Sequence, residues 1–187
     1  MRLALLIAST ALVVIPAAAA AQTVPLPRFE SIELSGGGSV TVRPGPVQRV
    51  TLRSGSTEST GFEVRDRGRL VIHACERHCP LRYDLEIEIE TPELAAASVR
   101  GGGEIVADGA FRPQGSVSAA VSGGGKVDLR ALQARTASAA VNGGGKILVS
   151  AQSSHSAAVN GGGSIRYVGE PSVSTAIHGG GSVEPIR

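Results

Sequence analysis

Aromatic side chains are scarce in this sequence of 187 residues, which contains three Phe, two Tyr and no Trp. A conventional core of bulky side chains is therefore excluded, although the length fits one domain. An excess of one charge is also lacking, because 18 basic residues face 16 acidic ones and give a formal net charge of +2. Nucleic-acid-binding proteins usually combine a basic excess with aromatic platforms for stacking. Nucleic acid is therefore not an expected partner.

Long apolar runs are missing beyond the first residues. Residues 3–16, LALLIASTALVVIP, follow Met1 and Arg2 and precede a run of alanines, which is typical of a secretory signal peptide cleaved near Ala20 or Ala21. No later segment approaches the roughly 18 apolar residues of a membrane helix, so no membrane span is expected. We predict a signal peptide at 1–21, a short linker at 22–27 and a single domain at 28–187, in a protein that is periplasmic, secreted or on the cell surface.

The common catalytic and cofactor motifs are missing as well. Gly-Lys pairs occur at 125–126 and 145–146, but Val or Ile follows where a phosphate-binding loop needs a hydroxyl. Calcium-binding nonapeptide repeats require aspartates after their glycines at about half the spacing found here. A G-x-S-x-G elbow is absent, and the four histidines are scattered. We therefore expect no catalytic residues and no cofactor.

Glycine, in contrast, is abundant, with 25 residues, and much of it occurs in triplets. Triplets begin at positions 36, 101, 123, 143, 161 and 179, and the last five are separated by 22, 20, 18 and 18 residues. This regularity indicates a repeat protein in which each triplet is a structural corner. The predicted corner glycines are Gly36, Gly37, Gly38, Gly101, Gly102, Gly103, Gly123, Gly124, Gly125, Gly143, Gly144, Gly145, Gly161, Gly162, Gly163, Gly179, Gly180 and Gly181.

Aliphatic residues flank every triplet at fixed distances. The position two residues before the triplet holds Leu34, Val99, Val121, Val141, Val159 and Ile177. The position two residues after it holds Val40, Ile105, Val127, Ile147, Ile165 and Val183. Alternation with a period of two predicts strand, corner and strand in each repeat. The fold class is therefore all-β, and stacked repeats predict a narrow β-solenoid with coils of about 18–22 residues.

The first triplet is separated from the second by 65 residues that contain RVTLRS, GRLVIHA and YDLEIEIE. Each segment alternates, so we expect further strands, as irregular coils or as a small sheet that covers the N-terminal end. Near the other end, Pro185 cannot donate to a strand ladder and discourages edge pairing. Incomplete protection there would allow a homo-oligomer to form through the solenoid ends.

Three stretches, FESIELSGGGSVTVRPG, LEIEIETPELAAASVRGGGEIV and the AAVNGGG repeats, together resemble the head GIN domain family, whose members are labelled auto-transporter adhesins. The resemblance covers residues 28–187 and lies in the arrangement of weak repeats. It implies a right-handed single-stranded β-helix in an envelope or exported protein, and it carries over no catalytic or binding residue. The sequence departs from the family in using Gly-Gly-Gly where Gly-Ser-Gly is common, and in its cysteine segment.

The segment HACERHC, residues 73–79, contains both cysteines of the chain. An exported protein meets an oxidising compartment, where Cys75 and Cys79 are expected to form a disulfide. The alternative is a metal site, because His73, Cys75, His78 and Cys79 offer the sulfur and imidazole ligands that zinc or copper accepts. The sequence leaves both alternatives open.

Polar side chains adjoin the triplets on both sides. Those immediately before a triplet are Arg100, Ser122, Asn142, Asn160 and His178, and two of those immediately after are Lys126 and Lys146. Stacking would align them into a surface for a glycan or an envelope protein. The alternative is an asparagine ladder that only stabilises the stack.

The favoured hypothesis is an exported, non-catalytic scaffold or adhesion module, because the repeats continue along the chain without inserted loops. One alternative is a carbohydrate-active β-helix enzyme, for which Lys126, Asp128 and Arg130 are the nearest candidates for a charged cleft. The other is a periplasmic metal-binding protein that uses residues 73–79.

Overall fold

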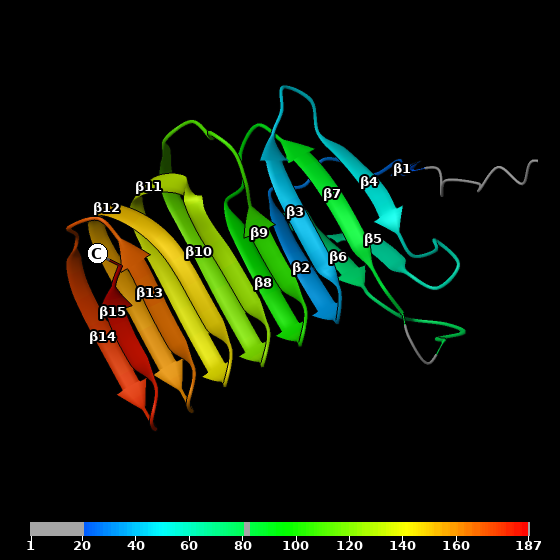
Figure 1. Cartoon of the computed structure of the whole chain (residues 1–187). Helices are drawn as coiled ribbons and strands as arrows, with labels where there is room; N and C mark the ends of the chain where they lie inside the picture. Colours follow the sequence, from blue (N-terminus) through cyan, green and yellow to red (C-terminus); the bar gives the residue numbers. More distant parts are fainter. Residues whose placement is uncertain (1–20, 81–82, 187) are drawn as a thin grey trace, which may run out of the picture.

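The computed structural model describes residues 21–80 and 83–186, so the predicted signal peptide at 1–21 lies almost entirely outside it. The described residues form one curled sheet of fifteen strands and contain no helix (Figure 1), and hence none that could cross a membrane. The strands are β1 (Gln22–Val24), β2 (Ser31–Gly36), β3 (Ser39–Pro44), β4 (Arg49–Ser54), β5 (Gly61–Arg65), β6 (Arg69–His73), β7 (Glu86–Thr91), β8 (Ala96–Gly101), β9 (Glu104–Ala107), β10 (Gln114–Gly123), β11 (Lys126–Gly143), β12 (Lys146–Asn160), β13 (Ser164–Val168), β14 (Ser172–His178) and β15 (Ser182–Pro185).

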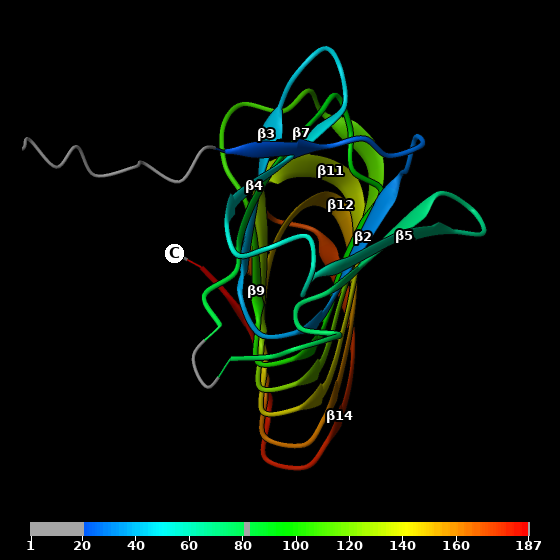
Figure 2. The ribbon, with the colours of Figure 1, turned by 90° about the vertical axis from the view of Figure 1, so that its right-hand side faces the viewer.

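Each glycine repeat contributes one strand to each of two faces. The first face contains the strands that lead into a corner, namely β2, β8, β10, the later parts of β11 and β12, and β14. The second face contains the strands that leave it, namely β3, β9, the earlier parts of β11 and β12, β13 and β15. All these pairings are parallel. Figure 2 shows the repeats superimposed as flattened loops with their corners along one edge.

The core lies between the two faces, and the register keeps equivalent residues together. Val121 pairs with Val141, Val141 pairs with Val159, and each is exposed by 1% or less. On the second face, Ile147 is buried between its neighbours in the same way. Small β-branched side chains suit such strands and fill a narrow interior without large rings. The scarcity of aromatic residues is therefore explained by the thinness of the core.

The glycine corners require glycine at their first and third positions. Gly123 has a φ of +118°, and a Cβ there would lie 2.7 Å from the carbonyl oxygen of Gly101 in the adjacent corner. A Cβ on Gly125 would lie 2.6 Å from the oxygen of Gly103. The middle residue, Gly124, would meet nothing within 4 Å. Positive φ and close backbone approach therefore explain two glycines of each triplet, but not the central one.

Strands from the 65-residue interval cover one end of the stack, as the sequence predicts. β2 and β3 pair with β8 and β9 on one side and with β6 and β7 on the other, so spatial order differs from chain order. β5 and β4 then add antiparallel edges to β6 and β7. The segment predicted as a linker, 22–27, differs from that expectation because it includes β1, which pairs with β4.

The opposite end of the stack consists of β14 and β15. In the described part of the chain, β14 pairs only with β12, and β15 pairs only with β13. All seven residues of β14 are exposed. This end therefore presents a strand edge and part of the apolar interior to solvent.

Candidate functional site

The polar residues that precede the corners form one continuous row, here called the corner row: Arg100, Ser122, Asn142, Asn160 and His178. Each pairs in register with the next across the first face. The Nδ2 group of Asn160 donates a hydrogen bond of 3.1 Å to Oδ1 of Asn142. The row thus contains a ladder contact, and its side chains are also exposed. Both predicted roles are compatible with this geometry.

Arg100 forms an ion pair that was not predicted from the sequence. Its Nε lies 3.0 Å from Oε1 of Glu33, whose side chain is 8% exposed, on neighbouring β2. Arg69 approaches the same carboxylate at 3.5 Å. Because Glu33 stands 67 positions earlier in the chain, local spacing gave no signal for this pair. Arg100 therefore ends the corner row in an ion pair.

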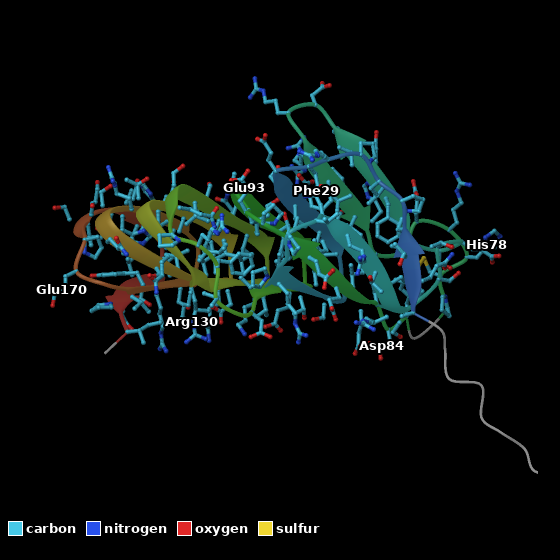
Figure 3. The ribbon with its side chains drawn as sticks, turned by 90° about the horizontal axis from the view of Figure 1, so that it is seen from above. Phe29, His78, Asp84, Glu93, Arg130 and Glu170 are labelled. Atoms are coloured by element: carbon cyan, nitrogen blue, oxygen red, sulfur yellow. A yellow bond between two sulfur atoms is a disulfide. The ribbon has the colours of Figure 1, made fainter. Side chains whose placement is uncertain are left out.

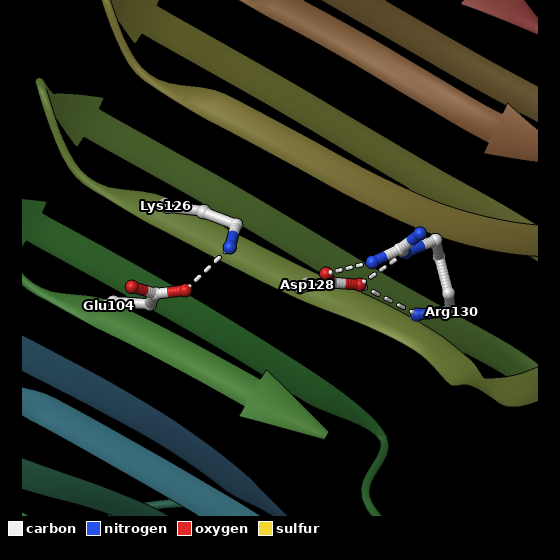
Figure 4. A network of polar contacts seen from close by, with 4 residues as sticks. All are labelled: Glu104, Lys126, Asp128 and Arg130. Carbon is white, nitrogen blue, oxygen red and sulfur yellow. Dashed lines mark hydrogen bonds and ion pairs between the residues drawn. The ribbon is translucent and has the colours of Figure 1, made fainter. Parts of the chain in front are cut away.

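Lys126 and Lys146 belong to the second face, so the structure divides the predicted surface in two. They are register neighbours at the start of β11 and β12. The Nζ of Lys126 lies 2.6 Å from Oε1 of Glu104 (Figure 4). The lysines consequently do not extend the corner row.

The three residues predicted to form a charged cleft belong to two separate ion pairs, Lys126 with Glu104 and Arg130 with Asp128. Asp128, which is 5% exposed, accepts hydrogen bonds from Nε of Arg130 at 2.9 Å and from Nη2 at 2.7 Å. Burial raises the pKa of Asp128, but the hydrogen bonds and charge of Arg130 outweigh it and leave the pKa below its ordinary value. Figure 4 shows Lys126 directed to Glu104, away from this pair. These residues are occupied with one another and do not converge on a cleft.

The two cysteines of HACERHC form a disulfide, with Cys75 and Cys79 Cα atoms 5.8 Å apart. Thiolate ligands are therefore not available for a metal, and the described residues contain no group of three or more His, Cys, Asp or Glu side chains suited to one. Figure 3 shows His78 at the end of the molecule opposite Glu170. The disulfide closes the loop between β6 and β7, where other repeats have a glycine corner.

A shallow groove of about 560 Å³ crosses the first face and was not predicted from the sequence. One side of it is a row of hydroxyls on Ser116, Thr136, Ser154 and Ser172. The other side is a second row on Ser118, Ser138, Ser156 and Ser174. Its floor is the strand backbone between the rows, at Val117, Ala137, His155 and Val173. We call this feature the hydroxyl groove.

The two faces differ in charge. The second face and its edges contain the pairs Arg43–Asp108, Arg49–Glu90, Arg53–Glu88, Lys126–Glu104, Arg130–Asp128 and Arg166–Glu184. The hydroxyl groove, in the described chain, is lined by no Asp, Glu, Lys or Arg. Between the groove and the corner row lie Ala120, Ala140, Ala158 and Ala176. From the groove to the corner row, the described first face therefore has no Asp, Glu, Lys or Arg at the outward positions of β10, β11, β12 and β14.

His155 lies beneath this face and was not singled out by the sequence. It is 1% exposed, its Nδ1 lies 3.2 Å from the carbonyl oxygen of Ala137, and its ring centroid is 5.2 Å from that of Tyr167. Its Nε2 has no hydrogen-bond partner in the described residues. Burial holds the pKa of His155 below its ordinary value, against the smaller opposing effect of the Ala137 contact. A neutral imidazole therefore fits this position.

Parallel repeats in register define a class of all-β repeat proteins. The family described as "Putative auto-transporter adhesin, head GIN domain" matches residues 28–115 and 114–171, and the chain belongs to this family. The fold is similar to the crystal structure of a "putative adhesin" from Bacteroides fragilis, with a TM-score of 0.54 and 18% identity over 89% of this chain and 96% of that one.

Two further structures are similar at a lower level. One is a "putative adhesin" from Parabacteroides merdae, with a TM-score of 0.43 and 14% identity over 90% of this chain and 96% of that one. The other is a "putative lipid binding protein" from Parabacteroides distasonis, with a TM-score of 0.36 and 16% identity over the same shares. Among curated proteins, none matches this sequence.

Proposed function

We propose that this protein is an exported, non-catalytic adhesion or interaction module built as a right-handed β-solenoid. The parallel, in-register stacking of successive repeats supports the solenoid. Family membership and the disulfide support export to an oxidising compartment. The ion-paired state of Asp128 and Lys126 supports a non-catalytic role.

The observation that carries this proposal is the regular, exposed first face. An exposed β-sheet is usually protected by charges, yet the four strands β10, β11, β12 and β14 present hydroxyls, alanines and amides there. A rigid sheet holds such groups in fixed positions, which lowers the entropic cost of binding a repetitive partner. The partner would be an envelope protein or a glycan.

The test is binding of the purified protein to a glycan array and to separated envelope proteins. A double variant, Asn142→Glu with Asn160→Glu, should weaken binding, because it places two like charges in neighbouring corner-row positions. Ser164→Glu on the second face is the matched control and should bind as the wild type does. Release of reducing or unsaturated ends from a bound glycan would contradict the non-catalytic role.

The same proposal includes pairing of two copies through their β14 edges. The edge strand has no Asp, Glu, Lys, Arg or Pro, and two of its apolar residues are exposed, Val173 at 39% and Ile177 at 44%. Antiparallel pairing centred on Thr175 would place Val173 opposite Ile177 of the second copy, in a closed two-fold contact. Light scattering should show a concentration-dependent dimer that Ile177→Lys abolishes and Ser182→Lys retains. A wild-type monomer at every concentration would refute the pairing.

A further inference from the structure

We propose that the hydroxyl groove binds a neutral, linear polysaccharide chain that lies across the strands. This inference rests on the proposed function, since it names the partner class for the first face. It concerns residues that are distinct from the corner row. The inference is carried by the shape, the charge and the hydrogen-bonding chemistry of the groove together.

The shape of the groove suits an extended polymer. Its two hydroxyl rows follow the stacking direction from β10 to β14, with one hydroxyl of each row on each strand. At the usual strand separation of about 4.8 Å, three intervals give a straight path of about 14 Å. Such a path accommodates several sugar units in line. Every strand offers the same pair of contacts, so a repeating ligand meets a repeating surface.

The groove continues beyond β10 into a second, larger hollow. This hollow has a volume of about 1070 Å³, lies between the loops that join the two faces away from the glycine corners, and shares Ala95 and Ser116 with the groove. Glu93, Arg112 and Gln114 are among its lining residues. The Nε2 of Gln114 is buried and has no hydrogen-bond partner in the described residues. A chain longer than the hydroxyl rows would therefore enter a space lined in part by polar side chains.

The chemistry of the rows favours a neutral ligand rich in hydroxyls. Each Ser or Thr hydroxyl both donates and accepts hydrogen bonds, as does each hydroxyl of a sugar. An anionic polymer would be expected to bind charged donors such as Arg, and the hydroxyl rows contain none. A peptide strand would need a free sheet edge, whereas the inner strands of this face are paired on both sides.

Among the described residues, no Phe, Tyr or Trp lines the groove, and this predicts the character of the binding. A sugar ring bound there has no Phe, Tyr or Trp face to stack on. Each sugar unit therefore contributes only hydrogen bonds to the protein, and these replace hydrogen bonds that the sugar made to water. Affinity should consequently be weak for a single sugar and rise with chain length. It should level off once the hydroxyl rows and the adjoining hollow are filled.

The test is an NMR titration of the isotope-labelled protein with cellohexaose and maltohexaose, with glucose as the single-unit comparison and hexagalacturonate as the anionic one. A neutral hexasaccharide should shift the amide signals of residues 116–118, 136–138, 154–156 and 172–174, whereas glucose should shift them at least tenfold less at equal concentration. Ser138→Lys with Ser156→Lys should weaken that binding at least tenfold. Ser164→Lys with Ser182→Lys, an in-register pair on the second face, should change it less than twofold.

Three results would overturn the inference: no shift with either neutral hexasaccharide, equally tight binding of hexagalacturonate by the wild type, or binding that the groove variant leaves unchanged. These outcomes are separable from failure of the proposed function. If the wild type binds an envelope partner that the corner-row variant loses, while neither neutral hexasaccharide shifts the groove signals, the interaction module stands and the groove assignment falls. If neither variant nor the wild type binds any envelope component or glycan, both fall.

Discussion

The requirement for glycine at a corner can be tested by comparing two adjacent residues, Gly143 and Gly144. Gly143 has a φ of +116°, and a Cβ there would lie 2.8 Å from the oxygen of Gly123. Left-handed strain costs about 1–3 kcal/mol, and forcing the adjacent backbone apart costs about 1–3 kcal/mol more. We therefore expect Gly143→Ala to lower the free energy of unfolding by about 2–6 kcal/mol.

Gly144 provides the control within the same corner. Its φ lies outside the left-handed region and a Cβ would meet no atom within 4 Å, so Gly144→Ala should be neutral or stabilise by up to about 1 kcal/mol. For a chain of this size each kcal/mol corresponds to about 2–4 °C in Tm. Calorimetry should then show a loss of about 4–24 °C in Tm for Gly143→Ala and no loss for Gly144→Ala. Equal losses would refute the explanation by φ and close approach.

Three further predictions concern buried or bonded groups. Burial lowers the pKa of His155 below the 6.5 of the unfolded chain, so the free energy of unfolding should fall as pH drops through 6.5 toward the folded pKa. The loss should be about 1.4 kcal/mol for each unit by which the pKa is lowered. In urea titrations, His155→Phe should flatten this dependence on pH. Arg130→Ala should cost about 1–3 kcal/mol at pH 7 by leaving Asp128 without its partner. That difference should shrink as pH falls through the lowered pKa of Asp128, and a constant difference would contradict the pairing. Reducing the Cys75–Cys79 disulfide should cost about 2 kcal/mol for its five-residue loop, measured as a lower Tm that a Cys→Ser double variant reproduces.

The strands and corners of the repeats could be predicted, because short-range sequence patterns specify them. The alternation around Val141 and the adjacent triplet specifies a strand, a corner and a strand, and identical neighbours one repeat away favour in-register stacking. The disulfide was expected from the predicted signal peptide and the presence of two cysteines. The corner row followed from the same repeat spacing, which places Asn142 beside Asn160.

The long-range part could not be predicted, because alternation says that a strand exists but not which strand it pairs with. β6 and β7 follow β2 and β3 in the chain yet lie outside them in the stack. The Glu33–Arg100 ion pair depends on that arrangement. The hydroxyl groove was missed for a different reason, since Ser138 and Ser156 read as ordinary solvent-facing residues. Their alternation does not show that they border one groove across four strands.

The glycine corners and the uncharged face are physically connected. Because the corner backbones approach to van der Waals distance, register is fixed along one edge of the stack, independently of the outward side chains. Those outward positions are then free to differ between faces. The second face has cross-strand ion pairs at Lys126–Glu104 and Arg166–Glu184. The first face has ion pairs to Glu33 among β2, β6 and β8, but hydroxyls and alanines over β10 to β14. Alanine is a poor strand former, so its repetition at Ala120, Ala140 and Ala158 does not serve sheet stability. It keeps the surface between the groove and the corner row free of long side chains, so that they do not block a polymer that lies across the strands.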